Sequence, residues 1–107
     1  MRIEQPHQLG KAEARKRVEA LVEELVRETL PAGVVLSELV KEWNADTMQF
    51  SFTAKKGFFG AKITGSLAVT DNQLNLEIEL PSILKSFVPE DKIRDAIQQK
   101  LASVCRD

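Results

Sequence analysis

The chain has 107 residues, of which 43% are hydrophobic and 29% charged, and its formal net charge at pH 7 is −1. This length and composition indicate one globular domain over residues 1–107. They argue against a disordered chain, which combines low hydrophobicity with high net charge, and against a nucleic-acid-binding protein, which usually carries a basic excess. The single cysteine, Cys105, excludes an internal disulfide and a four-cysteine metal site.

The sequence predicts neither a secretory signal nor a transmembrane segment. The first residues contain no apolar run after a basic start. No window approaches the roughly 20 apolar residues that a membrane-spanning helix requires. We therefore expect a cytoplasmic protein whose lone thiol stays reduced.

The first elements expected are a short strand and a long helix. Weak alternation over residues 2–6 predicts a strand that ends at Pro6. Apolar residues then recur every three or four positions, which predicts a helix over residues 9–29, stopped by Pro31 and Gly33. Its apolar stripe consists of Ala14, Val18, Leu21, Val22 and Leu25.

Four further strands follow along the chain, at residues 34–43, 48–54, 61–69 and 74–80. In the last three, apolar and polar residues alternate, so one face of the sheet is expected to be buried and the other hydrated. The connections at residues 44–46, 55–60 and 71–72 are short and rich in turn-forming residues. Three short connections in a row predict an antiparallel meander.

The end of the chain is expected to be helical. Pro81 ends the sheet, Ser82 begins a short turn through Phe87, and a helix begins near Pro89 or Glu90. The apolar stripe of this helix consists of Ile93, Ala96, Ile97, Leu101 and Val104. The predicted fold is α+β, a two-layer sandwich in the order β-α-β-β-β-β-α with both helices on the apolar face of the sheet. We expect the apolar side chains of the two layers to cover one another and leave little space.

No catalytic, cofactor-binding or metal-binding residues can be assigned from motifs, so we expect a protein that is not an enzyme. Gly57 and Gly60 lie between strands rather than before a helix, unlike a phosphate-binding loop. His7, the one histidine, is either a general base or a residue that caps or packs the entry to the first helix. No spacing pairs it with a nucleophile, which favours the structural interpretation.

Three other residue types are better explained by structure than by chemistry. Glu77 and Glu79 share the polar face of a strand, where a solubilising role is simpler than acid–base work. Trp43 precedes a turn and is expected to anchor the edge of the core. Cys105 lies on the last turn of the last helix with no neighbour in sequence that would activate it.

The most unusual segment is a cluster of lysines and phenylalanines. Its candidate contact residues are Lys55, Lys56, Phe58, Phe59 and Lys62, and no acidic residue lies between Asp46 and Asp71. Adjacent phenylalanines point to opposite sides of a regular strand, so one interpretation leaves one ring exposed among lysines. Such a surface suits an apolar, anionic partner. The alternative is a glycine-assisted bulge that turns both rings inward.

A second apolar segment covers residues 83–88. Its candidate interface residues are Ile83, Leu84, Phe87 and Val88. The segment either plugs one end of the core as a short helix or forms a surface for a ligand or a second copy of the chain.

Taken together, four segments resemble the polyhydroxyalkanoic acid (PHA) system family, small bacterial proteins encoded near polyester-storage genes. They read IEQPHQLGKAEARKRVEALVEEL, WNADTMQFSF, GFFGAKITGSLAVTDNQLNLEIELP and IRDAIQQKL, and they span nearly the whole chain. The resemblance implies an accessory or regulatory factor of PHA granules, bound to the granule surface or to a granule-associated protein. It implies no catalytic residue.

Three functional hypotheses therefore remain open. The first is a non-enzymatic PHA accessory protein that uses the lysine and phenylalanine segment. The second is a carrier or enzyme for a small hydrophobic ligand, with a cavity near Gly65 between the sheet and the helices that reaches His7 or Trp43. The third is a homo-oligomer formed through an open sheet edge or through residues 83–88.

Overall fold

A computed structural model describes residues 1–27, 33–87 and 89–105. Its elements confirm the predicted α+β order, with the short turn after the sheet formed as a six-residue helix. They are β1 (Arg2–Pro6), α1 (Lys11–Leu25), β2 (Val35–Asn44), β3 (Thr47–Lys56), β4 (Phe59–Val69), β5 (Gln73–Glu79), α2 (Ser82–Phe87) and α3 (Glu90–Val104).

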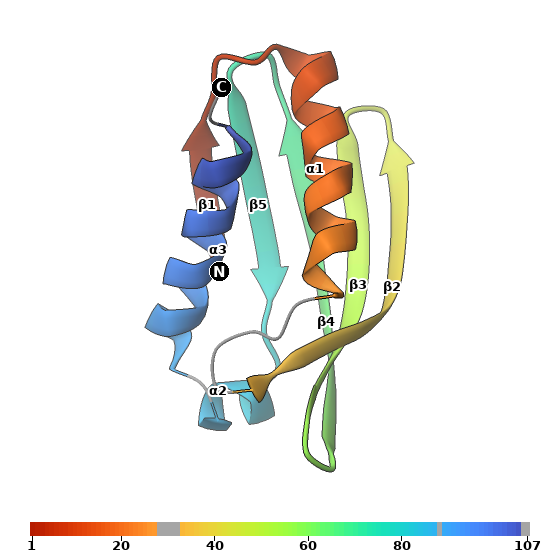
Figure 1. Ribbon diagram of the computed structural model, residues 1–107, viewed down its shortest axis with the longest axis vertical. Helices are drawn as coiled ribbons and strands as arrows, with labels where there is room; N and C mark the ends of the chain where they lie inside the picture. Colours follow the sequence, from red (N-terminus) through yellow and green to blue (C-terminus); the bar gives the residue numbers. More distant parts are fainter. Residues whose placement is uncertain (28–32, 88, 106–107) are drawn as a thin grey trace.

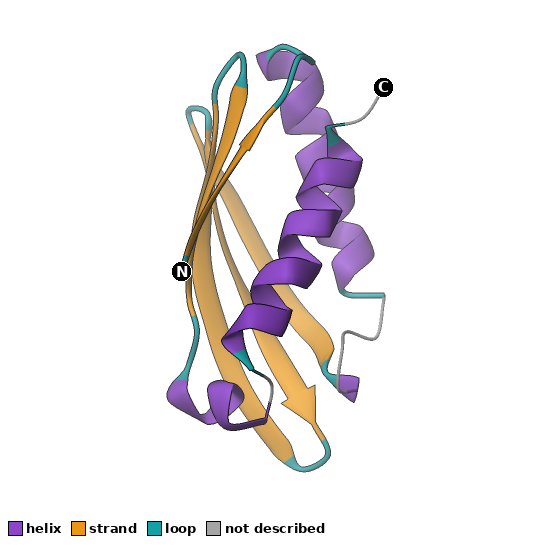
Figure 2. Cartoon of the chain, turned by 90° about the vertical axis from the view of Figure 1, so that its left-hand side faces the viewer, coloured by secondary structure: helices purple, strands orange, loops and turns teal. Residues whose placement is uncertain are grey.

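The strands form one antiparallel sheet in the order β1-β5-β4-β3-β2. Strands β2 to β5 are the predicted meander, and β1 adds to the free edge of β5, where Ile3 lies opposite Leu76. Helices α1 and α3 run antiparallel to each other across one face of this sheet, as Figures 1 and 2 show. Among the described helices, none of comparable length covers the other face (Figure 2).

Helix α1 is shorter than the predicted span of residues 9–29. It begins at Lys11 because Gly10 has a positive φ of 79°, and Leu9 is held outside the helix by its N–H bond to Nδ1 of His7. The helix ends at Leu25, with Val26 as the C-cap residue. Of the predicted stops, Gly33 follows this end by several residues and Pro31 lies outside the described residues.

Strand β2 contains a β-bulge that changes its direction. Ser37 lies opposite Thr53 and Val40 opposite Ser51, so Glu38 and Leu39 together oppose one residue of β3. Glu38 adopts a positive φ of 55°, and its carboxylate accepts a 2.6 Å hydrogen bond from the Thr53 hydroxyl. Bulges bend a strand, and Figure 1 shows the first part of β2 swinging across the lower end of the sheet.

The extra residue also reverses which side chains of β2 face the helices. Before the bulge, Val34 and Leu36 are buried while Val35 is exposed. After it, Leu39 and Trp43 pack against the core, and Val40 is 64% exposed on the other side. Strands β3, β4 and β5 keep regular alternation, and their inward residues form the centre of the core with the buried face of α1.

Candidate functional site

The lysine and phenylalanine segment forms the end of the long β3–β4 hairpin. We call the five residues Lys55, Lys56, Phe58, Phe59 and Lys62 the hairpin tip. The ladder between the strands continues without interruption to the pair Lys56 and Phe59, and Gly57 and Phe58 make the turn. Gly57 has a positive φ of 61°, which suits a tight hairpin turn. Figure 1 shows this hairpin projecting beyond the helices.

Both phenylalanine rings of the hairpin tip are exposed. Phe58 is fully exposed and Phe59 is 51% exposed. The alternative, a bulge that turns both rings inward, is wrong because the β3–β4 register has no irregularity that would turn them. Phe59 has the same inward orientation along β4 as Ile63, but it lies past the end of the core.

The charged side chains of the hairpin tip itself are all lysines. Lys55 and Lys62 are exposed, and both lie on the face of the sheet opposite the helices. No aspartate or glutamate occurs from Thr47 to Thr70, so carboxylates near these strands come from other elements. One of them is Glu38 of β2, which accepts the hydrogen bond from Thr53, opposite Lys62. The structure therefore combines exposed aromatic rings with positive charge at one end of the molecule.

A second feature, which we call the inner cavity, lies between the sheet and the two long helices. Its volume is about 440 Å³. Apolar side chains line it from every layer: Leu21, Val22 and Leu25 on α1, Phe50, Ile63, Leu67 and Ile78 on the sheet, and Ile93, Ala96 and Ile97 on α3. The expectation that apolar side chains leave little space is wrong, because this cavity lies between the two layers.

The position of the inner cavity differs from the sequence-based hypothesis in two respects. Its lining includes neither His7 nor Trp43. The space above Gly65 is also occupied, since a Cβ atom at Gly65 would lie 2.8 Å from Cζ of Phe50. The cavity therefore results from the spacing between helices and sheet rather than from this glycine.

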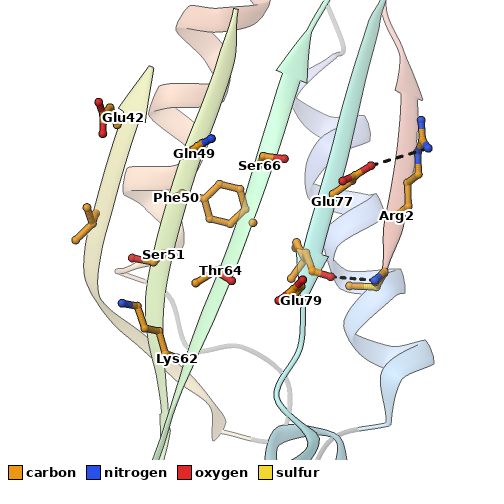
Figure 3. A pocket seen from close by; sticks show the side chains of 14 residues that line it. Arg2, Glu42, Gln49, Phe50, Ser51, Lys62, Thr64, Ser66, Glu77 and Glu79 are labelled. Atoms are coloured by element: carbon orange, nitrogen blue, oxygen red, sulfur yellow. Dashed lines mark hydrogen bonds and ion pairs between the residues drawn. The ribbon is translucent and has the colours of Figure 1, made fainter. Parts of the chain in front are cut away.

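The opposite face of the sheet carries a broad, open hollow of about 710 Å³. Figure 3 shows its labelled residues spread over neighbouring strands, with Glu77 beside Arg2. The Glu77 carboxylate lies 3.9 Å from the Arg2 guanidinium, and the side chains of both residues are more than half exposed. Glu77 and Glu79 are exposed, so neither carboxylate is desolvated as an acid–base pair would require.

His7 is a structural residue at the entry to α1. It is 5% exposed, and its Nδ1 accepts the N–H of Leu9 at 3.1 Å. Its Nε2 lies 3.0 Å from the carbonyl oxygen of Thr70, so Nε2 carries the proton and donates it. The ring thus joins the β1–α1 connection to the β4–β5 turn, and both of its nitrogens are occupied by backbone groups.

Sequence reasoning missed a polar cluster that joins α1 to β2. The indole Nε1 of Trp43 donates a 2.7 Å hydrogen bond to Glu19, and the guanidinium of Arg15 lies 4.3 Å from the centre of the Trp43 ring. Lys41 donates a 2.8 Å hydrogen bond to Glu23, which lowers the pKa of that carboxyl. The signal in the sequence is the i,i+4 spacing of these three residues of α1.

The remaining candidates give no reactive group. Burial raises the pKa of the Cys105 thiol, an effect that the nearby Arg17 opposes. Throughout residues 1–27, 33–87 and 89–105, no three histidine, cysteine or acidic side chains gather as a metal site would require. The side chains of the interface candidates Ile83, Leu84, Phe87 and Val88 lie outside the described part of the structure.

A comparison with protein families matches residues 1–104 to the model described as "putative polyhydroxyalkanoic acid system protein". The chain belongs to this family. The match confirms the resemblance noted in the sequence and places the protein in the PHA system. Searches of curated proteins and of solved structures found no match. Among the described helices of this PHA system protein, none is long and apolar enough to cross a membrane.

Proposed function

We propose that this protein is a non-enzymatic accessory factor of the PHA system that contacts the surface of the granule through its hairpin tip. The observation that carries the proposal is the full exposure of Phe58 beside the half-exposed Phe59. Membership of the PHA system family supplies an apolar partner of the right kind, a polyester particle. The protein is then a cytoplasmic one that acts at the granule.

Physical chemistry supports this choice of contact. Large apolar rings at a hairpin end have no structural reason to face water, and burying one against an apolar surface gains roughly 1.5–3 kcal/mol. The lysines Lys55 and Lys62 flank the rings without opposing carboxylates on β3 or β4. Positive charge beside apolar side chains favours a surface that is both apolar and anionic.

The proposal is tested by co-sedimentation of the purified protein with isolated PHA granules. The test variant is Phe58→Ser/Phe59→Ser, and the matched control is Val35→Ser/Val40→Ser, which removes two exposed apolar side chains from the edge strand β2. We expect the wild type and the control to sediment with the granules and the test variant to remain in solution. Circular dichroism melting checks that all three are folded.

Two results would contradict the proposal. Equal binding by the wild type and the test variant removes the hairpin tip from the contact. Absence of binding by the wild type removes the granule contact itself.

A further inference from the structure

The inner cavity supports an inference that goes beyond surface contact. We propose that it binds a single-chain alkanoic acid, with the hydrocarbon chain between α1, α3 and the sheet and the carboxylate at the Lys100 side of α3. The inference does not depend on the hairpin tip, whose residues are absent from the cavity lining.

The size of the inner cavity is the first argument. Its volume of about 440 Å³ falls in the range of roughly 300–1,000 Å³ that is typical of small-molecule sites. Protein interiors are otherwise close-packed, and unfilled apolar volume destabilises the fold. A space of this size between two well-formed layers is therefore better explained by an occupant than by imperfect packing.

The second argument is the incomplete burial of apolar residues around this space. On α3, the side chains of Ile93, Ala96 and Ile97 face the cavity and are only half-buried, whereas Leu101 is 2% exposed. On the sheet, the buried residues Phe50, Ile63 and Ile78 line the same cavity. An apolar ligand would cover these surfaces from both layers at once.

The spacing between α1 and α3 shows which end of the cavity is narrow. Arg17 donates a 3.0 Å hydrogen bond to the carbonyl oxygen of Val104, which joins α1 to the end of α3. From this contact the helices diverge toward the end of α1 and the start of α3, as Figure 1 shows. The residues that line the cavity from α1 lie in its last turns, Leu21, Val22 and Leu25.

The distribution of polar groups selects a ligand with one polar end. Within the described part of the chain, the polar side chains that line the cavity all come from α3, and they are Gln99, Lys100 and Ser103. The sheet and α1 contribute only apolar side chains, so a ligand with polar groups along its length would lose hydrogen bonds on binding. A hydrocarbon chain with a polar head near α3 avoids this cost.

The charge of the residues that line the cavity indicates the charge of the ligand's polar end. Lys100 is half-buried and is the one charged residue of the lining within the described structure. Among the residues that the structure describes, no aspartate or glutamate lines the cavity to repel an anion. The Lys100 ammonium has three N–H donors, so a carboxylate at this end of the cavity accepts from it alongside the ammonium's other contacts, in a partly desolvated position where charge-assisted hydrogen bonds are strongest.

The experiment measures binding of decanoic acid by calorimetry, below the concentration at which it forms micelles. The plugging variant is Ala96→Trp, which adds bulk to the cavity lining, and its control is Gln98→Trp on the exposed side of α3. We expect saturable binding at one site by the wild type and the control. We expect Ala96→Trp to bind at least about tenfold more weakly, a loss of roughly 1.4 kcal/mol.

A second variant tests the polar end and does not depend on the plug. Lys100→Met is expected to weaken decanoic acid binding about tenfold and to leave binding of the uncharged methyl decanoate unchanged. Phe58→Ser/Phe59→Ser is expected to bind decanoic acid as the wild type does. Its loss of granule binding therefore tests the proposed function separately.

Amide NMR shifts locate the ligand in the wild type without any substitution. The expected shifts lie on the residues of α3 that line the cavity and on strands β3 to β5. Absence of saturable binding, shifts confined to the hairpin tip, or full-strength binding by a folded Ala96→Trp would each overturn the inference.

Discussion

The aromatic ring of Phe50 takes the place of a side chain at Gly65. The two residues lie directly opposite each other in the β3–β4 ladder. A Cβ atom at Gly65 would lie 2.8 Å from the Phe50 ring and 2.5 Å from the backbone oxygen of Glu77 on β5. The glycine therefore allows an aromatic ring and three strands to approach one another closely in the middle of the sheet.

Replacing this glycine should destabilise the protein. We expect Gly65→Ala to lower the free energy of unfolding by about 1–3 kcal/mol, because the new methyl group overlaps both the ring and the backbone of β5. Gly60→Ala is the matched control, since its nearest neighbour would lie 3.8 Å away. Urea denaturation of both variants measures the difference, and equal stability would contradict the role assigned to Gly65.

The two hydrogen bonds of His7 predict a stability effect and a tautomer. His7→Ala removes a buried ring and leaves the Leu9 N–H and the Thr70 carbonyl without their partner, so we expect a loss of roughly 1–3 kcal/mol in the free energy of unfolding. Gln8→Ala, at the exposed neighbouring position, should be nearly neutral. Nitrogen chemical shifts should report the neutral ring with the proton on Nε2, and a proton on Nδ1 would contradict the geometry.

The Trp43 indole links the edge strand to α1. We expect Trp43→Phe to lower the free energy of unfolding by about 1–2 kcal/mol, because it removes the hydrogen bond to Glu19 and weakens the contact with Arg15. Glu19→Gln keeps an oxygen that can accept from the indole, so it should cost much less. Thermal unfolding followed by circular dichroism tests whether Trp43→Phe lowers the stability more than Glu19→Gln does. A larger loss for Glu19→Gln would refute this explanation.

The Cys105 thiol should react slowly in the folded protein. Burial raises its pKa, so at pH 8 less thiolate is present than in the unfolded chain. The raised pKa favours the folded state at low pH, and this contribution is lost as pH rises through the folded value. Iodoacetamide alkylation should therefore be slower in buffer than in urea, with the difference shrinking at higher pH. Faster alkylation of the folded protein would contradict the burial argument.

The bulge in β2 predicts an unusually large effect of losing one residue. Deleting Glu38 removes the extra position, so the strand before it must either shift its pairing or turn Leu36 outward. We expect a loss of several kcal/mol, comparable with roughly 2–5 kcal/mol for removing a large buried side chain. Glu38→Gly keeps the chain length and suits the positive φ, so it should be much milder. Similar melting temperatures for the two variants would contradict this account.

The regular strands and the helix order were predictable from local patterns. Apolar and polar residues alternate along strands β3, β4 and β5. A period of two puts the apolar residues of each strand on one face, and that face must be the one against the helices. Strand β2 was harder because its apolar residues change phase at Glu38, so no single alternation describes it. The adjacency of Phe58 and Phe59 left two outcomes open, one exposed ring or a bulge that buries both, and the structure instead exposes both rings.

The inner cavity could not be predicted in the same way. A sequence shows which side chains face inward, such as Phe50 and Ile97, but it does not show how far a helix lies from the sheet. That distance depends on packing over the whole layer, including the bend in β2 and the Arg17 contact at the end of α3. The Trp43 cluster was missed because it requires α1 to lie over one particular edge of the sheet.

The hairpin tip and the wide end of the helix pair lie at the same pole of the molecule (Figure 1). Strand β4 begins there with Phe59, and helix α3 begins there with Glu90. A protein that contacts a particle through Phe58 would therefore place its inner cavity close to the polymer surface. An acyl chain could then pass between the two while crossing only a short layer of water.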